Sequence, residues 1–233
     1  MQYLALILDA PLQSWGFASR FQRRTTSLHP TKSGVVGLIC AALGLAKGSH
    51  VEREWLPRVA ALQMTTVAIP RRPLVTFEKP HQQPIRVRRL EDFHTVENTR
   101  RASGSLNPDQ VITRREYLLD ALFGVILAGS SETLARVANA LQNPAWGIWL
   151  GRKCCIPAAP LYRAGPCDEV IAWQAILGDK PRTNFDSVEE ANSFESGTDS
   201  VPDQPISFGV ADSSGCDSRQ FSLRRVKFIP RSQ

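Results

Sequence analysis

The sequence predicts an α+β fold built on a ferredoxin-like (RRM-like) βαββαβ core. Three observations predict it: apolar segments of strand length recur, two segments have the length and spacing of helices, and the two kinds follow each other in the βαββαβ order. In that topology the first and third strands are central neighbours, and the sheet face opposite the helices often binds RNA. The expected elements are strand 3–8, helix 31–45, strand 61–69, strand 116–128, helix 130–142 and strand 146–151.

A polar turn, Thr31-Lys32-Ser33-Gly34, opens the first predicted helix. We expect the hydroxyl of Ser33 to cap this helix, because serine is a preferred N-cap residue. The unpaired N–H groups and the dipole at a helix N-terminus suit a phosphate, and Lys32 adds a full positive charge beside them. The alternative is a capped core helix that binds no ligand. A Walker A loop is excluded, because the sequence lacks G-x-x-x-x-G-K-[ST].

The segment from about residue 70 to 115 interrupts the core pattern. It contains five prolines and scattered apolar residues, and Ile85-Arg86-Val87-Arg88 alternates as a half-exposed strand does. We therefore expect an extended β-hairpin that projects from the core. The alternative is a loop that becomes ordered only against a neighbouring protein.

The C-terminal third has a weaker pattern. Short strands are predicted at 171–177 and 221–229. We expect two units: a ferredoxin-like RNA-binding domain at 1–153, with the hairpin inserted at about 70–115, and a β-rich extension at 154–233 packed on that domain.

The basic and acidic residues are segregated in this chain of 233 residues, whose net charge is +6. Residues 168–203 hold nine Asp or Glu against two basic residues, whereas 19–35 and 217–233 are basic. This favours a polyanionic partner such as nucleic acid, with the acidic stretch facing away from it. No stretch is apolar and long enough to cross a bilayer, so we expect a cytoplasmic protein without a membrane partner.

The cysteines predict free thiols rather than a metal site or disulfides. Their number is odd and no C-x-x-C pair occurs, which is typical of buried thiols in a reducing compartment. No metal and no cofactor are expected. The five cysteines are Cys40, Cys154, Cys155, Cys167 and Cys216.

Five short motifs lie in a fixed order along nearly the whole chain. They are Leu12-Gln13-Ser14-Trp15-Gly16, Pro30-Thr31-Lys32-Ser33-Gly34-Val35-Val36-Gly37-Leu38, Asp92-Phe93-His94-Thr95-Val96, Arg115-Glu116-Tyr117-Leu118-Leu119-Asp120-Ala121 and Leu150-Gly151-Arg152-Lys153-Cys154. A weaker match is Arg219-Gln220-Phe221, and residues 168–203 contain no match. In these motifs the chain resembles CasD, the fifth Cas family of type I-E CRISPR systems.

The resemblance implies a ferredoxin-like core with a β-hairpin thumb. It implies binding of the repeat-derived 5′ handle of CRISPR RNA within the Cascade surveillance complex, which defends against phage and plasmid DNA. The implied protein partners are the backbone subunit CasC, whose filament this subunit caps, and the large subunit CasA. Target DNA is reached indirectly, through the complex. A separate endonuclease cuts the precursor RNA in type I-E systems, so no cleavage is expected of this subunit.

Single-stranded RNA is held by cations and N–H groups on phosphates, planar rings on bases, and polar groups on base edges. Alternatives stay open at two places: Trp15 as a wedge that holds its loop on the core, and Arg23 with Arg24 as a solvated pair. The candidates for phosphate contact are Arg23, Arg24, Lys32, Ser33, Gly34, Arg100, Arg114, Arg152 and Lys153; for stacking, Trp15 or His94; for base edges, Gln13 and Thr95.

Two other function classes remain as hypotheses. The first is a metal-independent endoribonuclease that processes precursor CRISPR RNA, as type I-C relatives do, with His94 as base and Tyr117 and Lys32 or Lys153 nearby. The second is a structural subunit with protein contacts alone. The segregated basic residues argue against this second class, because counterion release from RNA is their natural use.

Overall fold

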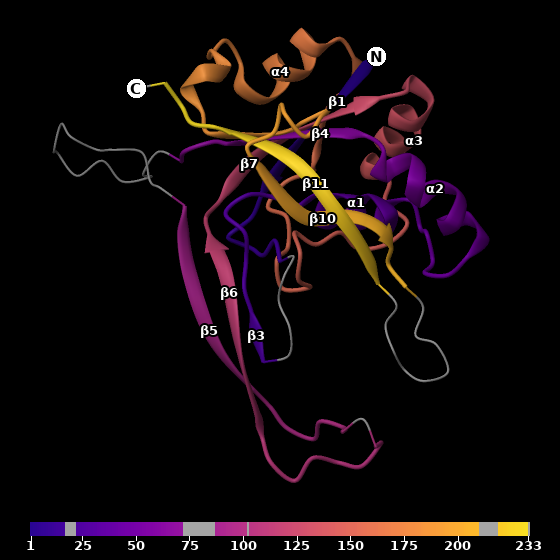
Figure 1. Ribbon diagram of the computed structural model, residues 1–233, viewed down its shortest axis with the longest axis vertical. Helices are drawn as coiled ribbons and strands as arrows, with labels where there is room; N and C mark the ends of the chain where they lie inside the picture. Colours follow the sequence, from indigo (N-terminus) through magenta and orange to yellow (C-terminus); the bar gives the residue numbers. More distant parts are fainter. Residues whose placement is uncertain (17–21, 72–86, 102, 210–218, 233) are drawn as a thin grey trace, which may run out of the picture.

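The computed structural model describes residues 1–16, 22–71, 87–101, 103–209 and 219–232 and has an α+β fold with antiparallel sheets (Figure 1). Its elements are β1 (Gln2–Asp9), β2 (Leu12–Gln13), β3 (Arg23–Arg24), α1 (Lys32–Ala42), α2 (His50–Ala60), β4 (Gln63–Ala68), β5 (Arg88–Val96), β6 (Val111–Leu119), β7 (Leu122–Gly129), α3 (Ser131–Gln142), β8 (Tyr162–Cys167), α4 (Glu169–Leu177), the short 3-10 helix η1 (Arg182–Asn184), β9 (Ser187–Glu190), β10 (Asp199–Ser207) and β11 (Gln220–Ile229).

A seven-stranded sheet in the order β10-β11-β9-β4-β7-β1-β8 forms the centre of the molecule. Each neighbouring pair of strands is antiparallel. The chain passes from β1 to β4 through α1 and α2, and from β7 to β8 through α3. Segments far apart in sequence therefore lie side by side, and the C-terminal strands continue the sheet that the N-terminal strands begin.

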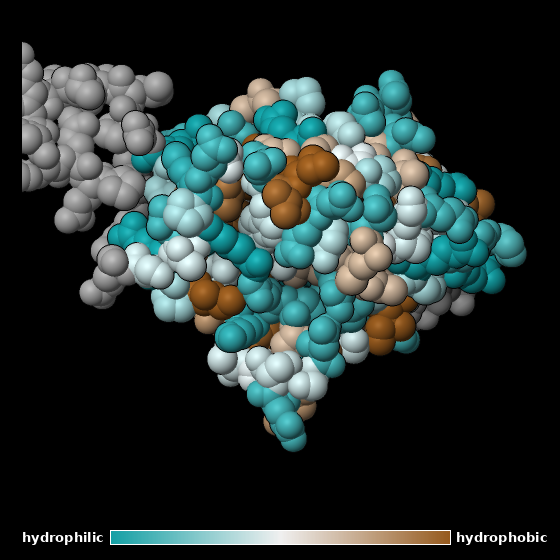
Figure 2. Space-filling view, turned by 90° about the horizontal axis from the view of Figure 1, so that it is seen from above, coloured by the Kyte–Doolittle hydropathy of each residue, from teal (hydrophilic) through white to brown (hydrophobic). Residues whose placement is uncertain are grey.

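Both faces of the sheet are covered by helices. Along β1 the side chains alternate: Leu4, Leu6 and Leu8 belong to the main core with α1 and α3, whereas Ala5 packs with Ala172 of α4. The face opposite α1 and α3 therefore lies under α4 around Ala5, so this part of it is not an open RNA platform of the kind common in the topology. Seen from the α4 side, the surface is mostly hydrophilic with separate hydrophobic patches (Figure 2).

Hydroxyl side chains cap α1, α2 and α3, but the N-cap residue of α1 is not the predicted one. Thr31, not Ser33, is the N-cap residue, and its side chain accepts a hydrogen bond from Gly34 N at 3.3 Å. Ser49 and Ser130 cap α2 and α3 in the same way. No helix in the described part of the chain is long and apolar enough to cross a membrane.

Three expected elements differ from the structure. The strand expected at 116–128 is divided into β6 and β7, because Asp120 adopts a left-handed conformation (φ 49°) that an aspartate tolerates and a straight strand does not. Residues 146–151 form no strand, and β8 pairs with β1 instead. Residues 171–177 lie in helix α4. By contrast, β1, β4, α3 and β11 lie where strands 3–8 and 61–69, helix 130–142 and strand 221–229 were expected.

A second sheet carries a long hairpin away from the core. β6 pairs with β2, with β3 in parallel, and with β5, whose register runs from Arg88 opposite Leu119 to Val96 opposite Val111. The β5–β6 hairpin projects well beyond the seven-stranded sheet (Figure 1). Ile85 and Arg86 of the predicted strand at 85–88, and Cys216, lie outside the described residues, whereas Arg88 begins β5.

The boundary expected at residue 153 falls inside a shared sheet. β8 pairs with β1 at one edge, and β9 pairs with β4 farther along, so residues from both sides of that boundary hydrogen-bond to one another. The division into 1–153 and 154–233 stays a prediction. The four described cysteines are free.

Candidate nucleic-acid interface

An open cavity of about 400 Å³ lies at the N-terminal end of α1. Four of its lining residues are basic and two are phenylalanines, and none of the described residues that line it is acidic. Cations beside exposed rings are the combination that single-stranded nucleic acids require. The lining residues are Ser14, Gly16, Arg24, Thr31, Ser33, Gly34, Lys47, Gly151, Arg152, Pro202, Phe208, Arg219 and Phe221.

Arg152 is held in the cavity by two contacts. Its Nη2 donates to the carbonyl oxygen of Arg24 at 2.9 Å, and its guanidinium lies 4.6 Å from the centre of the Tyr117 ring. Tyr117 is buried, and its hydroxyl accepts a hydrogen bond from Cys154 Sγ at 3.6 Å. Desolvation raises the pKa of Tyr117, and the nearby Arg152 opposes that rise. Tyr117 is therefore a buried anchor for Arg152.

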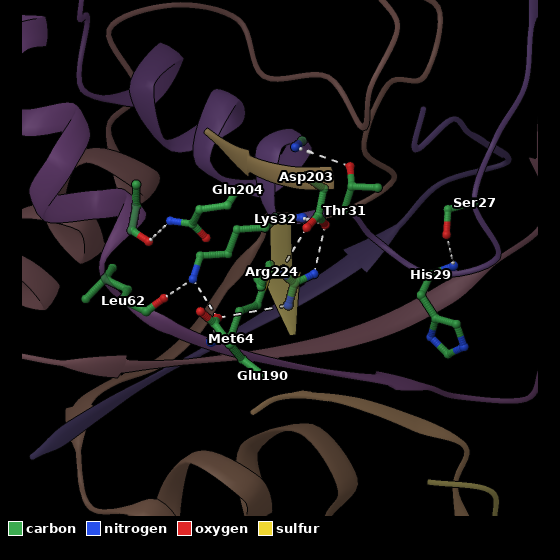
Figure 3. Close-up of polar contacts among 12 residues, drawn as sticks. Ser27, His29, Thr31, Lys32, Leu62, Met64, Glu190, Asp203, Gln204 and Arg224 are labelled. Atoms are coloured by element: carbon green, nitrogen blue, oxygen red, sulfur yellow. Dashed lines mark hydrogen bonds and ion pairs between the residues drawn. The ribbon is translucent and has the colours of Figure 1, made fainter. Parts of the chain in front are cut away.

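The phosphate role expected of Lys32 is wrong. Only 1% of this residue is exposed, and its Nζ lies 2.6 Å from Glu190 Oε2 and donates to the carbonyl oxygen of Leu62 (Figure 3). Burial lowers the pKa of Lys32, and Glu190 opposes this shift by favouring the charged form. The ammonium group is bonded to partners inside the protein, and Lys32 is not among the residues that line the cavity.

A buried charge network surrounds Lys32. Asp203 accepts two hydrogen bonds from Arg224, Nε to Oδ1 and Nη2 to Oδ2, each 2.8 Å long (Figure 3). Its Oδ2 also accepts the backbone N–H of Lys32 at 2.7 Å. Glu190 Oε2 accepts the backbone N–H of Met64 at 3.0 Å. The network therefore joins α1 and β4 to β9, β10 and β11, the strands that carry the C-terminal wall of the cavity.

Gln13 and Trp15 also differ from their expected roles. Trp15 is 1% exposed and donates its indole N–H to Gln13 Oε1 at 3.0 Å. Gln13 is 0% exposed and donates to the carbonyl oxygens of Leu8, at 3.0 Å, and Ala121, at 2.7 Å. Neither side chain can reach a base, because both are buried under the loop. The wedge interpretation of Trp15 is the one that the structure bears out.

The ring of Trp15 packs so close to position 34 that only glycine fits there. A Cβ atom at this position would lie 2.8 Å from Trp15 Cε3, which is closer than real Cβ contacts come. Its N–H is bonded to the Thr31 hydroxyl. Gly34 and Ser33 remain partly exposed in the cavity wall, so backbone contacts to a ligand are open to them.

Four further candidates lie on the hairpin, away from the cavity. His94 and Thr95 on β5, Arg114 on β6 and Arg100 beyond β5 are exposed. Arg114 has its guanidinium 4.7 Å from the centre of the Phe93 ring. The structure therefore divides the predicted residues between a cavity and a hairpin.

The two remaining basic candidates lie near the cavity. Arg23 is exposed on β3 and lies 3.7 Å from Glu116, on the neighbouring strand. Lys153 is exposed, with its Nζ 5.9 Å from the centre of the Trp149 ring. The cavity is lined by the immediate neighbours of these residues, Arg24 and Arg152.

The alternative catalytic set is not assembled in the structure. His94 is paired with Thr113, four residues before Tyr117 on β6, which corresponds to about 13 Å along a strand. Lys32 lies against Glu190, whereas Tyr117 lies against Arg152. A base, a tyrosine and a cation do not converge on one point here.

Four residues that line the cavity were not among the predicted site residues: Lys47, Phe208, Arg219 and Phe221. Phe221 is 40% exposed, and its ring centre lies 6.3 Å from that of Phe208. The weak Arg219-Gln220-Phe221 motif was the available signal. It places a cation and a ring at the start of β11.

Comparison with known proteins agrees with this arrangement. The model of the family described as CRISPR-associated protein (Cas_Cas5) matches residues 3–227. The CRISPR system Cascade subunit CasD of Escherichia coli (strain K12) is 30% identical over 183 residues, which are 77% of each chain. A chain of a CRISPR RNA-guided surveillance complex has a TM-score of 0.72 at 26% identity, covering 98% of this chain and 90% of its own. The crystal structure of a Cas protein has a TM-score of 0.62 at 29% identity, covering 98% and 95%.

The family match covers nearly the whole chain, including the motifs that line the cavity and those on the hairpin. The sequence of the E. coli relative supports the same family independently, and the two solved structures support it by their similar fold. The chain is therefore a member of the Cas5 family of CRISPR-associated proteins.

Proposed function

We propose that this protein is a non-catalytic subunit of a type I-E Cascade complex and that it binds the repeat-derived 5′ handle of CRISPR RNA. The observation that carries the proposal is the cavity at the start of α1, with four basic residues, two phenylalanines and no acidic residue among its described lining. The relatives support the setting, because one is a Cascade subunit and another belongs to an RNA-guided surveillance complex.

In this site, cations hold phosphates and a ring holds a base. Arg24, Lys47, Arg152 and Arg219 neutralise backbone phosphates, and the exposed face of Phe221 stacks on a base. The Tyr117 ring fixes the position of Arg152 before RNA binds, so less side-chain entropy is lost on binding. The partly exposed Ser33 and Gly34 add polar contacts at the start of α1.

We propose a ferredoxin-like core with a thumb for this chain. The strand order β4-β7-β1-β8, with α1 and α3 on one face, supports that core. The β5–β6 hairpin is the thumb, and its exposed His94, Thr95, Arg100 and Arg114 close over RNA that leaves the cavity. The expected partners are CasC, whose filament the subunit caps, CasA, and target DNA through the complex, all in the cytoplasm and without a cofactor.

The test is RNA binding by the assembled complex at several salt concentrations. The double variant Arg24→Ala, Arg152→Ala is expected to weaken handle binding and to flatten the plot of log affinity against log salt by about 1.4, or roughly 0.7 for each lost phosphate contact. Arg163→Ala, an exposed arginine on β8, is the matched control and should bind as the wild type does. Equal affinity and equal slope in all three proteins would contradict the proposal.

A further inference from the structure

Two tryptophans are exposed on the irregular segment between α3 and β8. Residues 146–151 have the apolar composition of a buried strand, yet Trp146 is 47% exposed and Trp149 is 38% exposed. Leaving indole rings in water forgoes the large stabilisation that their burial gives. Neither ring is among the residues that line the cavity. We therefore considered which ligand could cover these two exposed rings.

The segment runs beside α1 towards the cavity. Ala145 N donates to the carbonyl oxygen of Ala42 at 2.9 Å, at the C-terminal end of α1. Six residues later Gly151 lines the cavity at the N-terminal end, packed against Ser14. The helix between these points has 11 residues, or a length of about 16 Å. The tryptophans thus lie along a path that ends in the proposed RNA site.

The surroundings of the rings are basic and fixed. Residues 143–161 contain Arg152 and Lys153 and no acidic residue. Lys153 Nζ lies 5.9 Å from the centre of the Trp149 ring, where it can meet the phosphate of a base stacked there. A Cβ on Gly147 would lie 2.9 Å from Trp149 Cζ2, so the backbone at Gly147 supports this ring from one side.

We propose that Trp149 and Trp146 form a stacking path on which successive bases of single-stranded RNA lie between the cavity and the C-terminal end of α1. The inference rests on the proposed RNA-binding function and extends it to two residues outside the cavity. Aromatic rings accept any base, so this path holds RNA without reading its sequence.

A protein segment is the competing occupant. An apolar hollow of about 490 Å³ lies beside Ile148 and Pro144, and a partner's side chains could fill it. RNA is favoured because the segment that carries the rings ends in a basic cavity, at Gly151 and Arg152, and because this segment carries only positive charge. Residues 143–161 contain no acidic side chain that could form an ion pair with a basic group of a protein partner and so orient it.

The experiment uses the assembled complex and RNAs that begin with the repeat-derived handle and carry one 2-aminopurine at successive positions. Stacking on an indole quenches this fluorescent base. We expect quenching at positions next to the cavity in the wild type and its loss in Trp146→Ala and Trp149→Ala. The Trp→Phe variants, which keep a ring for stacking but have no indole, should lose quenching and keep most of the affinity. Each alanine variant should weaken binding by about 5- to 30-fold. Ile156→Ala, at a residue 65% exposed on the same segment, should change neither signal.

The outcomes separate the two proposals. If Arg24→Ala, Arg152→Ala abolishes binding but the tryptophan variants keep full quenching and affinity, the stacking path is wrong and the cavity stands. If the alanine variants lose a protein subunit from the complex, seen by native mass spectrometry, while RNA binding is unchanged, the segment is a protein interface and the path is again overturned. A wild-type complex that ignores the handle overturns both. Thermal unfolding of each variant checks that the fold is intact.

Discussion

Asp203 accepts the backbone N–H of Lys32 at 2.7 Å, so a carboxylate from β10 occupies the first turn of α1. This is the position that a bound phosphate would take if the start of α1 were an empty anion site. Asp203 is itself held by Arg224, which makes the arrangement part of the core. Under the proposed function, RNA phosphates are therefore held by the cations around the cavity and not by the first N–H of this helix.

Asp203→Asn is expected to destabilise the protein strongly. The substitution removes the charge of the carboxylate that accepts two hydrogen bonds from the buried Arg224, and breaking a buried ion pair in this way costs about 3–5 kcal/mol of unfolding free energy. Urea unfolding followed by circular dichroism measures it. Asp109→Asn, at an exposed position, is the control and should change the unfolding free energy by less than about 0.5 kcal/mol.

Lys32→Met separates a structural lysine from an RNA-binding one. The variant loses the ion pair with Glu190 and should unfold more easily, by about 3 kcal/mol. Its folded fraction should bind handle RNA as tightly as the wild type, because Nζ does not face the cavity. Affinity measured well below the melting temperature tests this. A large loss of affinity in well-folded protein would restore Lys32 to the RNA site.

Two glycines of α1 should respond oppositely to alanine. Gly34→Ala places a methyl group 2.8 Å from the buried Trp15 ring, and such overpacking costs about 1–3 kcal/mol. Gly37→Ala meets its nearest atom, Phe208 Cζ, at 3.8 Å, so the better helix propensity of alanine should add up to about 1 kcal/mol. Melting temperatures of the two variants should therefore move in opposite directions from the wild type. A shared direction would mean that the contact with Trp15 does not decide the result.

His29 should make stability depend on mildly acidic pH. Burial lowers its pKa to about 4, although Asp186 opposes the shift. The unfolded state, with a pKa near 6.5, then binds more protons, so stability is full above about pH 6.5 and is lost as the pH falls towards 4, by up to about 3 kcal/mol. His29→Gln should flatten this part of the curve relative to the wild type. His50→Gln, at an exposed residue of α2, should leave the dependence unchanged.

Local patterns predicted the elements whose apolar residues recur at a strand or helix spacing within one short segment. The continuous apolar run of β1 and the spacing of Leu134, Val137 and Leu141 in α3 are visible without any tertiary information. The division at Asp120 and the helix α4 were not predicted. An apolar run has the same composition whether it forms one strand, divides between two sheets or forms a helix packed on a sheet. The tertiary setting decided these cases.

The site was predicted in part for the same reason. Arg24, Ser33 and Arg152 line the cavity, since residues that follow short motifs in loops tend to stay at the surface. Lys32 and Trp15 were misplaced, because their partners could not be inferred locally. A lysine beside a helix cap looks like a surface cation until a glutamate 158 residues away is placed beside it. Trp15 fills the space that Gly34 leaves.

The buried network around Lys32 also constrains when the protein can mature. Its two carboxylates are supplied by residues 158 and 171 positions later in the chain. A ribosome must therefore release most of the polypeptide before the first turn of α1 can settle, and until then an unneutralised ammonium group obstructs closure of the core. A chain truncated before Asp203 would lack the carboxylate that joins α1 to β11. Truncated products should therefore be degraded in the cell and should not enter an RNA-guided assembly.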